Sequence, residues 1–441
     1  MNNRIIGDFS QRLEAIVADT DTQTRMGKVS DVTGTLVRVT GLDLSVGELC
    51  EMLTPSGDIL QRAEVVGISR QGVVISPFGS LIGISSQTLV RRCRRSLSIP
   101  VGDAVLGRVL DSMGVPIDGK GPLNNVTLRS VMADPPDPMQ REMINKVFPT
   151  GVRAIDSLLT IGEGQRIGVF APAGVGKSTL MGMLARGATC DVIVITLIGE
   201  RGREVREFVE LILGEQGMKR AVVVCATSDR SAIERAKAAH AGTTIAEYFR
   251  DRGLKVLLMM DSLTRFARAM REIGLASGEP PARRGFPPSV FAELPRLVER
   301  SGMGRRGSIT ALYTILAEDE SGSDPVAEEV RGLLDGHIIL SRRIAAKNQY
   351  PAIDVLDSLS RVMTMIVDKR HQQAAGRMRQ LLAKFDDVEM LIQAGEYEAG
   401  QDRDADLAIA RIAGIKDFLS QPVTTLTPWP KTVAMLHDLI A

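Results

Sequence analysis

The sequence predicts a doubly wound α/β domain, preceded by a small β-barrel and followed by a helical domain. Between residues 26 and 95, short runs rich in Val, Ile and Thr alternate with glycine turns, which is typical of a barrel. Residues 96–362 alternate compact apolar runs with helical patterns, as expected of parallel strands covered by helices. Residues 363–441 are mostly helical in pattern, and residues 1–25 are predicted to form a helical arm.

Five apolar runs in the central segment predict its buried strands, at residues 166–170, 192–199, 221–227, 255–261 and 308–316. The intervening helical patterns include residues 202–213 and 231–253, and the tail has two further ones, at 372–395 and 404–419. This alternation predicts the doubly wound arrangement of strands and helices.

Composition excludes several classes of protein. The chain has 441 residues, with 54 basic and 53 acidic side chains, so its net charge of +1 gives no indication of nucleic-acid binding. No apolar run approaches the roughly 20 residues that span a bilayer. Four scattered cysteines without a CxxC pattern predict free, mostly buried thiols in a reducing cytoplasm. The basic run Arg91–Arg95 is interpreted as a solvated linker, or else as a contact with lipid or a neighbouring subunit.

The strongest local signal is APAGVGKS, residues 171–178, between a predicted strand and a predicted helix. Backbone N–H groups of such a loop surround phosphate oxygens, and its glycines permit the curvature. Lys177 would place its charge on the β- and γ-phosphates, and Ser178 would ligate Mg²⁺. Ala171 stands where the pattern usually has glycine, but the rest of the pattern is present. The residues expected to bind nucleotide here are Ala173, Gly174, Val175, Gly176, Lys177, Ser178 and Thr179.

Two carboxylates follow buried strands and are expected near this loop. Asp261 ends the run KVLLMMD and would support Mg²⁺, although a helix-capping role for it is the alternative. Glu200 comes just past the strand VIVITLI and is placed to polarise an attacking water. Taken alone, its charged surroundings, GERGRE, would more often begin a solvated helix.

These pieces, in this order, resemble the catalytic subunits of the rotary ATP synthase family, and more closely their export relatives, the type III secretion and flagellar ATPases. Segments 106–122, 150–166, 197–205 and 350–361 look like family signatures, and the last, YPAIDVLDSLSR, is long and specific. The resemblance covers nearly the whole chain. It implies a RecA-like nucleotide domain, an oligomerisation role for the barrel, and hydrolysis of ATP with Mg²⁺.

The resemblance also implies roles for single residues. Glu200 would polarise water, with Arg201 beside it on the γ-phosphate and Arg265 near the terminal phosphate. Arg361, directly after the Ser-x-Ser signature, would reach across a subunit boundary to the neighbour's nucleotide, as an arginine finger does. Tyr350 would stack on adenine; a core tyrosine is the alternative.

The resemblance does not decide the role of two regions. The sequence FLSQP, at 418–422, is followed by Val423 where synthase subunits have an aromatic residue, and Trp429 is the next aromatic. Either could complete the adenine pocket. The Pro/Gly-rich basic segment 274–291 resembles the part of the family that faces the central pore and stalk, with an ordinary mobile loop as the alternative.

Details of sequence favour export by an injectisome. GERGREV has Gly where synthase catalytic subunits have Thr, and segments 226–253 and 328–338 resemble injectisome enzymes more than flagellar ones. A flagellar export ATPase is the next alternative. A ring-shaped RNA translocase is disfavoured because residues 26–90 contain one aromatic, Phe78. An inactive structural subunit would lack Glu200.

The resemblance implies a cytoplasmic homo-hexamer peripheral to the inner membrane, with ATP at each subunit boundary. Its expected partners are a stator, a central stalk, chaperone–cargo complexes and the inner-membrane export gate, and no nucleic acid. The motor would release chaperones and unfold cargo.

Overall fold

A computed structural model describes residues 25–317 and 324–440 of the chain. They form two compact units, Met1–Leu97 and Ser98–Ala441, which are considered separately. The predicted helical arm lies outside the described residues apart from Arg25. The predicted boundaries at residues 25, 95 and 362 stay predictions.

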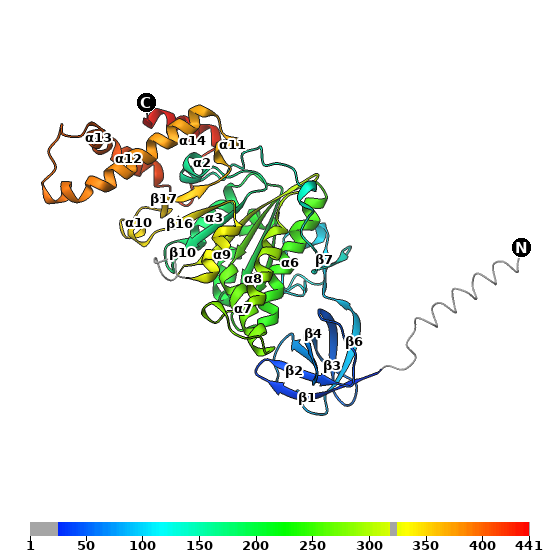
Figure 1. The fold of residues 1–441 in the computed structure, drawn as a ribbon. Helices are drawn as coiled ribbons and strands as arrows, with labels where there is room; N and C mark the ends of the chain where they lie inside the picture. Colours follow the sequence, from blue (N-terminus) through cyan, green and yellow to red (C-terminus); the bar gives the residue numbers. More distant parts are fainter. Residues whose placement is uncertain (1–24, 318–323, 441) are drawn as a thin grey trace, which may run out of the picture. The chain divides into compact units, whose positions relative to one another are not determined.

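The first unit contains the expected β-barrel (Figure 1). Its strands close in the order β1-β2-β5-β4-β3-β6, and every pair is antiparallel. Val37, Cys50, Met52 and Ile75 fill the interior and are fully buried. The strands are β1 (Gly27–Thr33), β2 (Leu36–Thr40), β3 (Glu48–Leu53), β4 (Ile59–Ser69), β5 (Gly72–Pro77) and β6 (Leu89–Ser96).

The basic run at 91–95 is part of the barrel, so its interpretation as a linker was wrong. It lies in β6, which pairs with both β1 and β3. Arg91 donates to Glu51 at 2.6 Å, and Arg92 donates to Glu48 at 3.1 Å from the neighbouring strand. Cross-strand pairs of opposite charge stabilise a sheet, which explains basic side chains in a strand.

The second unit is built on a sheet of mostly parallel strands (Figure 1). Its order is β17-β16-β10-β15-β13-β11-β12-β8; β16 and β17 are antiparallel, and β14 pairs with β15 beside this path. All five strands predicted from apolar runs are confirmed. The strands are β8 (Val109–Leu110), β10 (Arg166–Ala171), β11 (Val192–Ile198), β12 (Ala221–Ala226), β13 (Lys255–Asp261), β14 (Gly302–Met303), β15 (Ser308–Leu316), β16 (Gly336–Leu340) and β17 (Ile353–Ser360). A separate antiparallel pair joins β7 (Ser98–Val101) to β9 (Thr127–Ser130).

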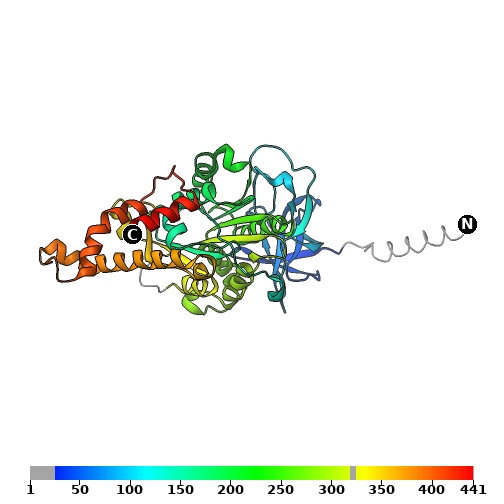
Figure 2. The same cartoon turned by 90° about the horizontal axis from the view of Figure 1, so that it is seen from above.

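Helices cover both faces of the sheet (Figure 2). One face carries α6 (Ala232–Asp251), α7 (Leu263–Ala276), α8 (Pro288–Glu299) and α9 (Pro325–Leu333), which pack on one another in this order. Of these, α6 and α7 contact β11 and β15, and α9 contacts β10. The other face carries α3 (Lys177–Gly187), α4 (Gly202–Glu207), the π-helix η3 (Phe208–Leu213) and α5 (Gly214–Met218). The predicted helix 202–213 therefore forms α4 and η3. This doubly wound fold confirms the predicted class.

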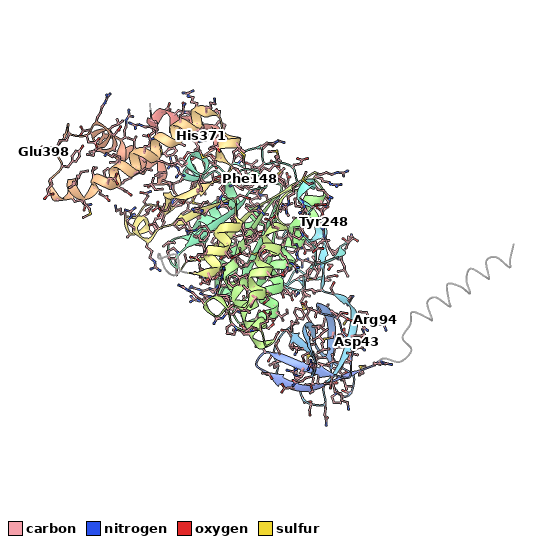
Figure 3. The ribbon with its side chains drawn as sticks, viewed as in Figure 1. Asp43, Arg94, Phe148, Tyr248, His371 and Glu398 are labelled. Atoms are coloured by element: carbon pink, nitrogen blue, oxygen red, sulfur yellow. The ribbon has the colours of Figure 1, made fainter. Side chains whose placement is uncertain are left out.

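Three helices form most of the C-terminal part: α12 (Lys369–Ala394), α13 (Arg403–Leu419) and α14 (Trp429–Ile440). They pack on the short helix α2 (Arg153–Leu158) of the nucleotide domain. His371, labelled in Figure 3, links the two parts because its Nε2 lies 2.7 Å from the Ser157 carbonyl oxygen. Its ring also contacts Trp429, with centroids 5.4 Å apart.

The remaining described helices are short: η1 (Asp103–Val105), η2 (Pro138–Gln140), η4 (Arg283–Gly285), α10 (Arg342–Ala346) and α11 (Met363–Ile366). Across the described ranges, no helix combines the length and the apolar character needed to cross a membrane. All four cysteines are free thiols, and Cys50 and Cys225 are buried.

Candidate active site

The phosphate-loop sequence forms the turn between β10 and α3. The apolar strand ends at Ala171, and α3 begins at Lys177. Gly174 and Gly176 have φ of +82° and +88°, left-handed values that other residues adopt only with strain. Ala173, Gly174 and Ser178 are at least partly exposed, whereas Val175 is buried in the core. The loop and the first turn of α3 therefore present backbone N–H groups to solvent, where an anion can bind.

Lys177 lies between the two predicted carboxylates. Its Nζ is 2.5 Å from Asp261 Oδ1 and 3.7 Å from Glu200 Oε1. The three side chains lie just past or at the carboxyl ends of three parallel strands: Lys177 begins α3 after β10, Glu200 lies in the turn after β11, and Asp261 is the last residue of β13. Because parallel strands end at one edge of a sheet, residues far apart in sequence meet there. The predicted grouping of Lys177, Glu200 and Asp261 is present.

Asp261 is held by a residue that sequence reasoning missed. Thr314 Oγ1 donates to Asp261 Oδ1 at 2.6 Å from β15, the strand next to β13. The signal was the second of two threonines in the largely apolar run SITALYTIL, close to its C-terminal end. The alternative capping role for Asp261 is not seen, because Ser262 caps α7 by accepting from the backbone N–H of Arg265.

Glu200 sits in a turn that the backbone fixes just after β11. The Gly199 N–H donates to the Ala226 carbonyl at 2.6 Å, and the Ser228 N–H donates to the Glu200 carbonyl at 3.0 Å. The carboxylate is buried, and its Oε1 has no hydrogen-bond partner among the described residues. Burial first, and then the charge of Asp261, raises the pKa of Glu200 from its ordinary 4.5 to about 7, against the opposing effect of Lys177 and Arg265.

Arg265 approaches the same carboxylate from α7. Its Nε lies 3.4 Å from Glu200 Oε1, and the two groups form an ion pair without a hydrogen bond. Gly199 makes this approach possible: a Cβ there would stand 2.8 Å from Arg265 Cδ, and its φ is +67°. Two cations thus face one carboxylate at the end of the sheet.

The structure does not bring the other two predicted arginines into this group. Arg201 is exposed, and its guanidinium pairs with Glu204 at 3.5 Å. Arg361 is also exposed, at the end of β17, and its backbone N–H donates to the Asp335 carbonyl at 3.0 Å. Within residues 25–317 and 324–440, no hydrogen bond or ion pair of the Arg361 side chain is found.

Tyr350 lies against the phosphate loop. A Cβ on Gly176 would stand 3.5 Å from the Tyr350 ring, and 38% of the residue is exposed. The neighbouring Gln421 N–H donates to the Tyr350 carbonyl at 2.8 Å, which brings the segment containing Val423 to this side. Trp429 instead packs on His371. This arrangement favours Val423 over Trp429 as the second wall of a base pocket.

The residues present fit a Mg²⁺ ion with bound phosphates. Asp261 uses Oδ1 for Lys177 and Thr314, and Glu200 Oε1, which accepts no hydrogen bond, is a further acceptor in the same group. Ser178 lies at the start of α3 and is not buried. Across the described part of the chain, no three His, Cys, Asp or Glu side chains gather to hold a metal. Mg²⁺ typically takes one or two protein carboxylates and completes its shell with phosphates and water.

Three protein-family models match the chain, one for the β-barrel, one for the nucleotide domain and one for the C-terminal helical part. The model described as the ATP synthase alpha/beta family, beta-barrel domain, matches residues 29–94. The nucleotide-binding domain of that family matches residues 151–360, and the T3SS EscN ATPase C-terminal domain matches residues 367–438.

Known relatives decide the subfamily. The type 3 secretion system ATPase of Xanthomonas euvesicatoria is 65% identical over 427 residues, 97% of each chain. The chain belongs to the type III secretion system ATPases. As a member of that family, it is a P-loop ATPase. The flagellum-specific ATP synthase of Bacillus subtilis is a more distant homologue, with 46% identity over 98% of each chain.

Solved structures of this ATPase family have the same fold. The assembled ATPase EscN from the enteropathogenic E. coli type III secretion system is 47% identical, with a TM-score of 0.90 over 94% of this chain and 100% of that one. EscN in complex with its central stalk EscO is 46% identical, with a TM-score of 0.87 over the same shares.

Proposed function

We propose that this chain is the hexameric motor of a type III protein-export machine, in which hydrolysis of Mg²⁺-bound ATP releases chaperones and unfolds cargo. The observation that carries the chemistry is the Lys177–Asp261–Glu200 group at the end of the sheet, directly beside an accessible phosphate loop. The identity to secretion ATPases along the whole chain supports the export role.

Each residue of the group has a distinct role in hydrolysis. Residues 173–179 hold the phosphates through backbone N–H groups. The Lys177 ammonium group leaves Asp261 and binds the β- and γ-phosphates when nucleotide is present. Ser178 and Asp261 hold Mg²⁺, which neutralises phosphate charge when bound. Glu200 orients the attacking water and accepts its proton as the water oxygen bonds to the γ-phosphorus and the bond from that phosphorus to the ADP oxygen breaks. Arg265 and Arg201 add positive charge near the terminal phosphate.

Assembly supplies the remaining part of the site. Arg361 is exposed and has a backbone fixed at the end of β17, which suits a side chain that reaches a neighbouring subunit's nucleotide. The EscN structures are those of an assembled ATPase and of its complex with a central stalk. We extend both features to this chain: a hexamer with a stalk. A stator, chaperone–cargo complexes and the export gate at the inner membrane are the further partners of this cytoplasmic motor.

The alternatives are weaker. A flagellar export ATPase has the same fold, but the identity of 65% to a secretion ATPase exceeds the 46% to the flagellar enzymes of Bacillus subtilis and Pseudomonas aeruginosa. RNA translocation needs exposed aromatic residues in the barrel for stacking. The single aromatic residue of the segment 26–90, Phe78, is only 8% exposed.

The test is ATP hydrolysis and secretion by Lys177→Ala in the full chain. Because Lys177 contributes charge to phosphate and little to packing, the variant should fold, lose turnover by at least about 100-fold and fail to support secretion. Lys431→Ala, which removes an exposed lysine from α14, is the matched control and should resemble the wild type. Phosphate release should rise cooperatively with protein concentration, and more steeply with the stalk protein. Wild-type turnover by Lys177→Ala would show that the proposed active site is wrong.

A further inference from the structure

Residues 420–427, which connect α13 to α14, form a strap against the nucleotide domain. Gln421 in this strap is only 2% exposed. Its side-chain Oε1 accepts from the Arg153 N–H at 2.8 Å, and its Nε2 donates to the Gly151 and Thr425 carbonyls at 2.8 and 2.7 Å. Its side-chain amide thus joins the strap to the start of α2 with two hydrogen bonds, and the third, to Thr425, lies within the strap.

The backbone of the same residue holds Tyr350. The Gln421 N–H donates to the Tyr350 carbonyl at 2.8 Å. The Tyr350 ring in turn lies beside Gly176, the residue that precedes Lys177 in the phosphate loop. Gln421 therefore contacts the residue whose ring is expected to stack on adenine, and its own hydrogen bonds reach none of the groups expected to bind phosphate.

A second contact ties the strap to the phosphate-loop helix. Arg186, in the last turn of α3, donates from Nη2 to the Val423 carbonyl at 2.9 Å and from Nη1 to the Ile212 carbonyl of η3 at 2.8 Å. Gly187 follows at the same helix end, where a Cβ would stand 2.1 Å from the Thr150 carbonyl oxygen. The strap, α2 and the end of α3 consequently form one closely packed block.

We propose that Gln421 is a positioning residue that fixes Tyr350 relative to the phosphate loop and so sets the affinity for the base of the nucleotide. The inference rests on the proposed nucleotide site and adds a residue to it. The side-chain amide anchors residue 421 to the start of α2, and the backbone N–H of the same residue then joins the end of α13 to the base pocket. A displacement of α13 would then change nucleotide affinity without moving Lys177 or Asp261.

Two substitutions separate this role from a contribution to packing. Gln421→Ala removes all three side-chain hydrogen bonds, leaves the partly buried Arg153 N–H without this acceptor, and leaves the Gly151 carbonyl with the Thr427 N–H alone. Gln421→Glu keeps the shape and an acceptor for Arg153, but it turns a carboxylate oxygen toward two carbonyl oxygens. Gln401→Ala, at an exposed glutamine between α12 and α13, is the matched control.

The experiment measures binding of ADP and of pyrophosphate to the full chain by calorimetry, with thermal unfolding as the check on folding. Both Gln421 variants should bind ADP roughly tenfold more weakly, in the range of a lost base-stacking contact, and pyrophosphate with the wild-type constant. In ATP hydrolysis, KM should rise with kcat nearly unchanged. Tyr350→Ala should show the same pattern, and adding Gln421→Ala to it should cause little further loss.

Equal losses for ADP and pyrophosphate, or no loss for either, would overturn the proposal. So would failure of both variants to fold, because Gln421 would then be a residue required for stability. If Lys177→Ala keeps wild-type affinity for pyrophosphate, the proposed phosphate site itself is wrong. If Lys177→Ala loses pyrophosphate while the Gln421 variants bind ADP normally, only the role of Gln421 is wrong.

Discussion

Ionisation of the buried Glu200 side chain destabilises the folded chain, and the position of Glu200 beside the phosphate loop explains why this residue is kept there. A buried carboxylate whose Oε1 lacks a hydrogen bond disfavours ionisation, and its pKa is accordingly raised to about 7. Strongly shifted groups of this kind gather at functional sites, where an unfavourably placed charge serves chemistry. A residue selected only for packing would be uncharged at this position, and the buried carboxylate thus supports the catalytic role proposed for Glu200.

Glu200→Gln should bind ATP with nearly wild-type affinity and lose turnover by about 100- to 10,000-fold. The amide has almost the same shape and can hydrogen-bond to water, but it cannot accept the proton. Binding is measured with a fluorescent ATP analogue, and turnover by phosphate release. A collapse of affinity instead would show that Glu200 is structural.

The same variant should change how stability depends on pH. The folded-state pKa of Glu200 is raised from 4.5 to about 7, so the folded chain binds more protons than the unfolded chain between these values. Stability therefore falls as pH rises through this window. Glu200→Gln removes that fall, so the nucleotide-free variant should melt a few degrees above the wild type at pH 8. The difference should shrink toward pH 4.5; a constant difference at all pH values would show that titration of Glu200 is not its cause.

The sequence predicted those site residues that follow a recognisable local pattern, and it missed the others. Lys177, Asp261 and Glu200 each follow a run that identifies a buried strand, so their convergence follows from parallel topology. Thr314 and Gln421 have no such local pattern, because their partners lie 53 and 71 residues away, at Asp261 and Tyr350. Arg201 follows Glu200 directly, yet it immediately precedes α4 and its guanidinium pairs with Glu204, a direction that adjacency in sequence does not specify.

Among the elements, apolar runs predicted strands well and charged runs did not. The five central strands are nearly continuous apolar sequences, since helices cover both of their faces. Strand β6 carries four arginines on one wall of the barrel, and the carboxylates that pair with Arg91 and Arg92 come from β3, about 40 residues earlier. A strand whose charges are neutralised by distant residues cannot be distinguished from a linker in the sequence alone.

The close contact between α6 and β11 at Gly242 predicts that a larger residue there would destabilise the domain. A Cβ on Gly242 would stand 1.9 Å from Thr196 Oγ1 and 3.2 Å from Thr196 Cβ, and Thr196 is fully buried. Gly242→Ala should therefore push α6 from the sheet and destabilise the domain by about 1–3 kcal/mol. Thermal unfolding measures this.

The control for that substitution is Gly376→Ala in α12. A Cβ there meets nothing within 4 Å, and the residue is exposed inside a helix. Because alanine favours helix over glycine, this variant should be neutral or more stable by about 0.5–1 kcal/mol. Equal stability of the Gly242 and Gly376 variants would mean that α6 and β11 are less closely packed than the contacts indicate.

At the scale of the whole molecule, the cations of the proposed mechanism do not all lie together in one chain. Lys177 and Arg265 both face Glu200, while Arg361 stands exposed at the end of β17, with no hydrogen bond or ion pair of its side chain in the described ranges. A fixed backbone with an exposed cationic side chain is suited to act across a boundary between copies. Arginine fingers supplied by a neighbour are worth about 10³–10⁵ in rate.

This arrangement predicts complementation between two inactive variants. Arg361→Ala subunits and Lys177→Ala subunits should each be nearly inactive alone. Mixed equally, they should recover part of the activity, because about a quarter of randomly formed boundaries pair an intact loop with an intact Arg361. Phosphate release by mixtures is measured at concentrations where rings form, after tagged pull-down shows that the variants assemble together.

Normal hydrolysis by Arg361→Ala rings would show that Arg361 does not act across the subunit boundary. Absence of rescue in proven mixed rings is less decisive, because strict sequential action of all boundaries gives the same result when each ring contains defective boundaries.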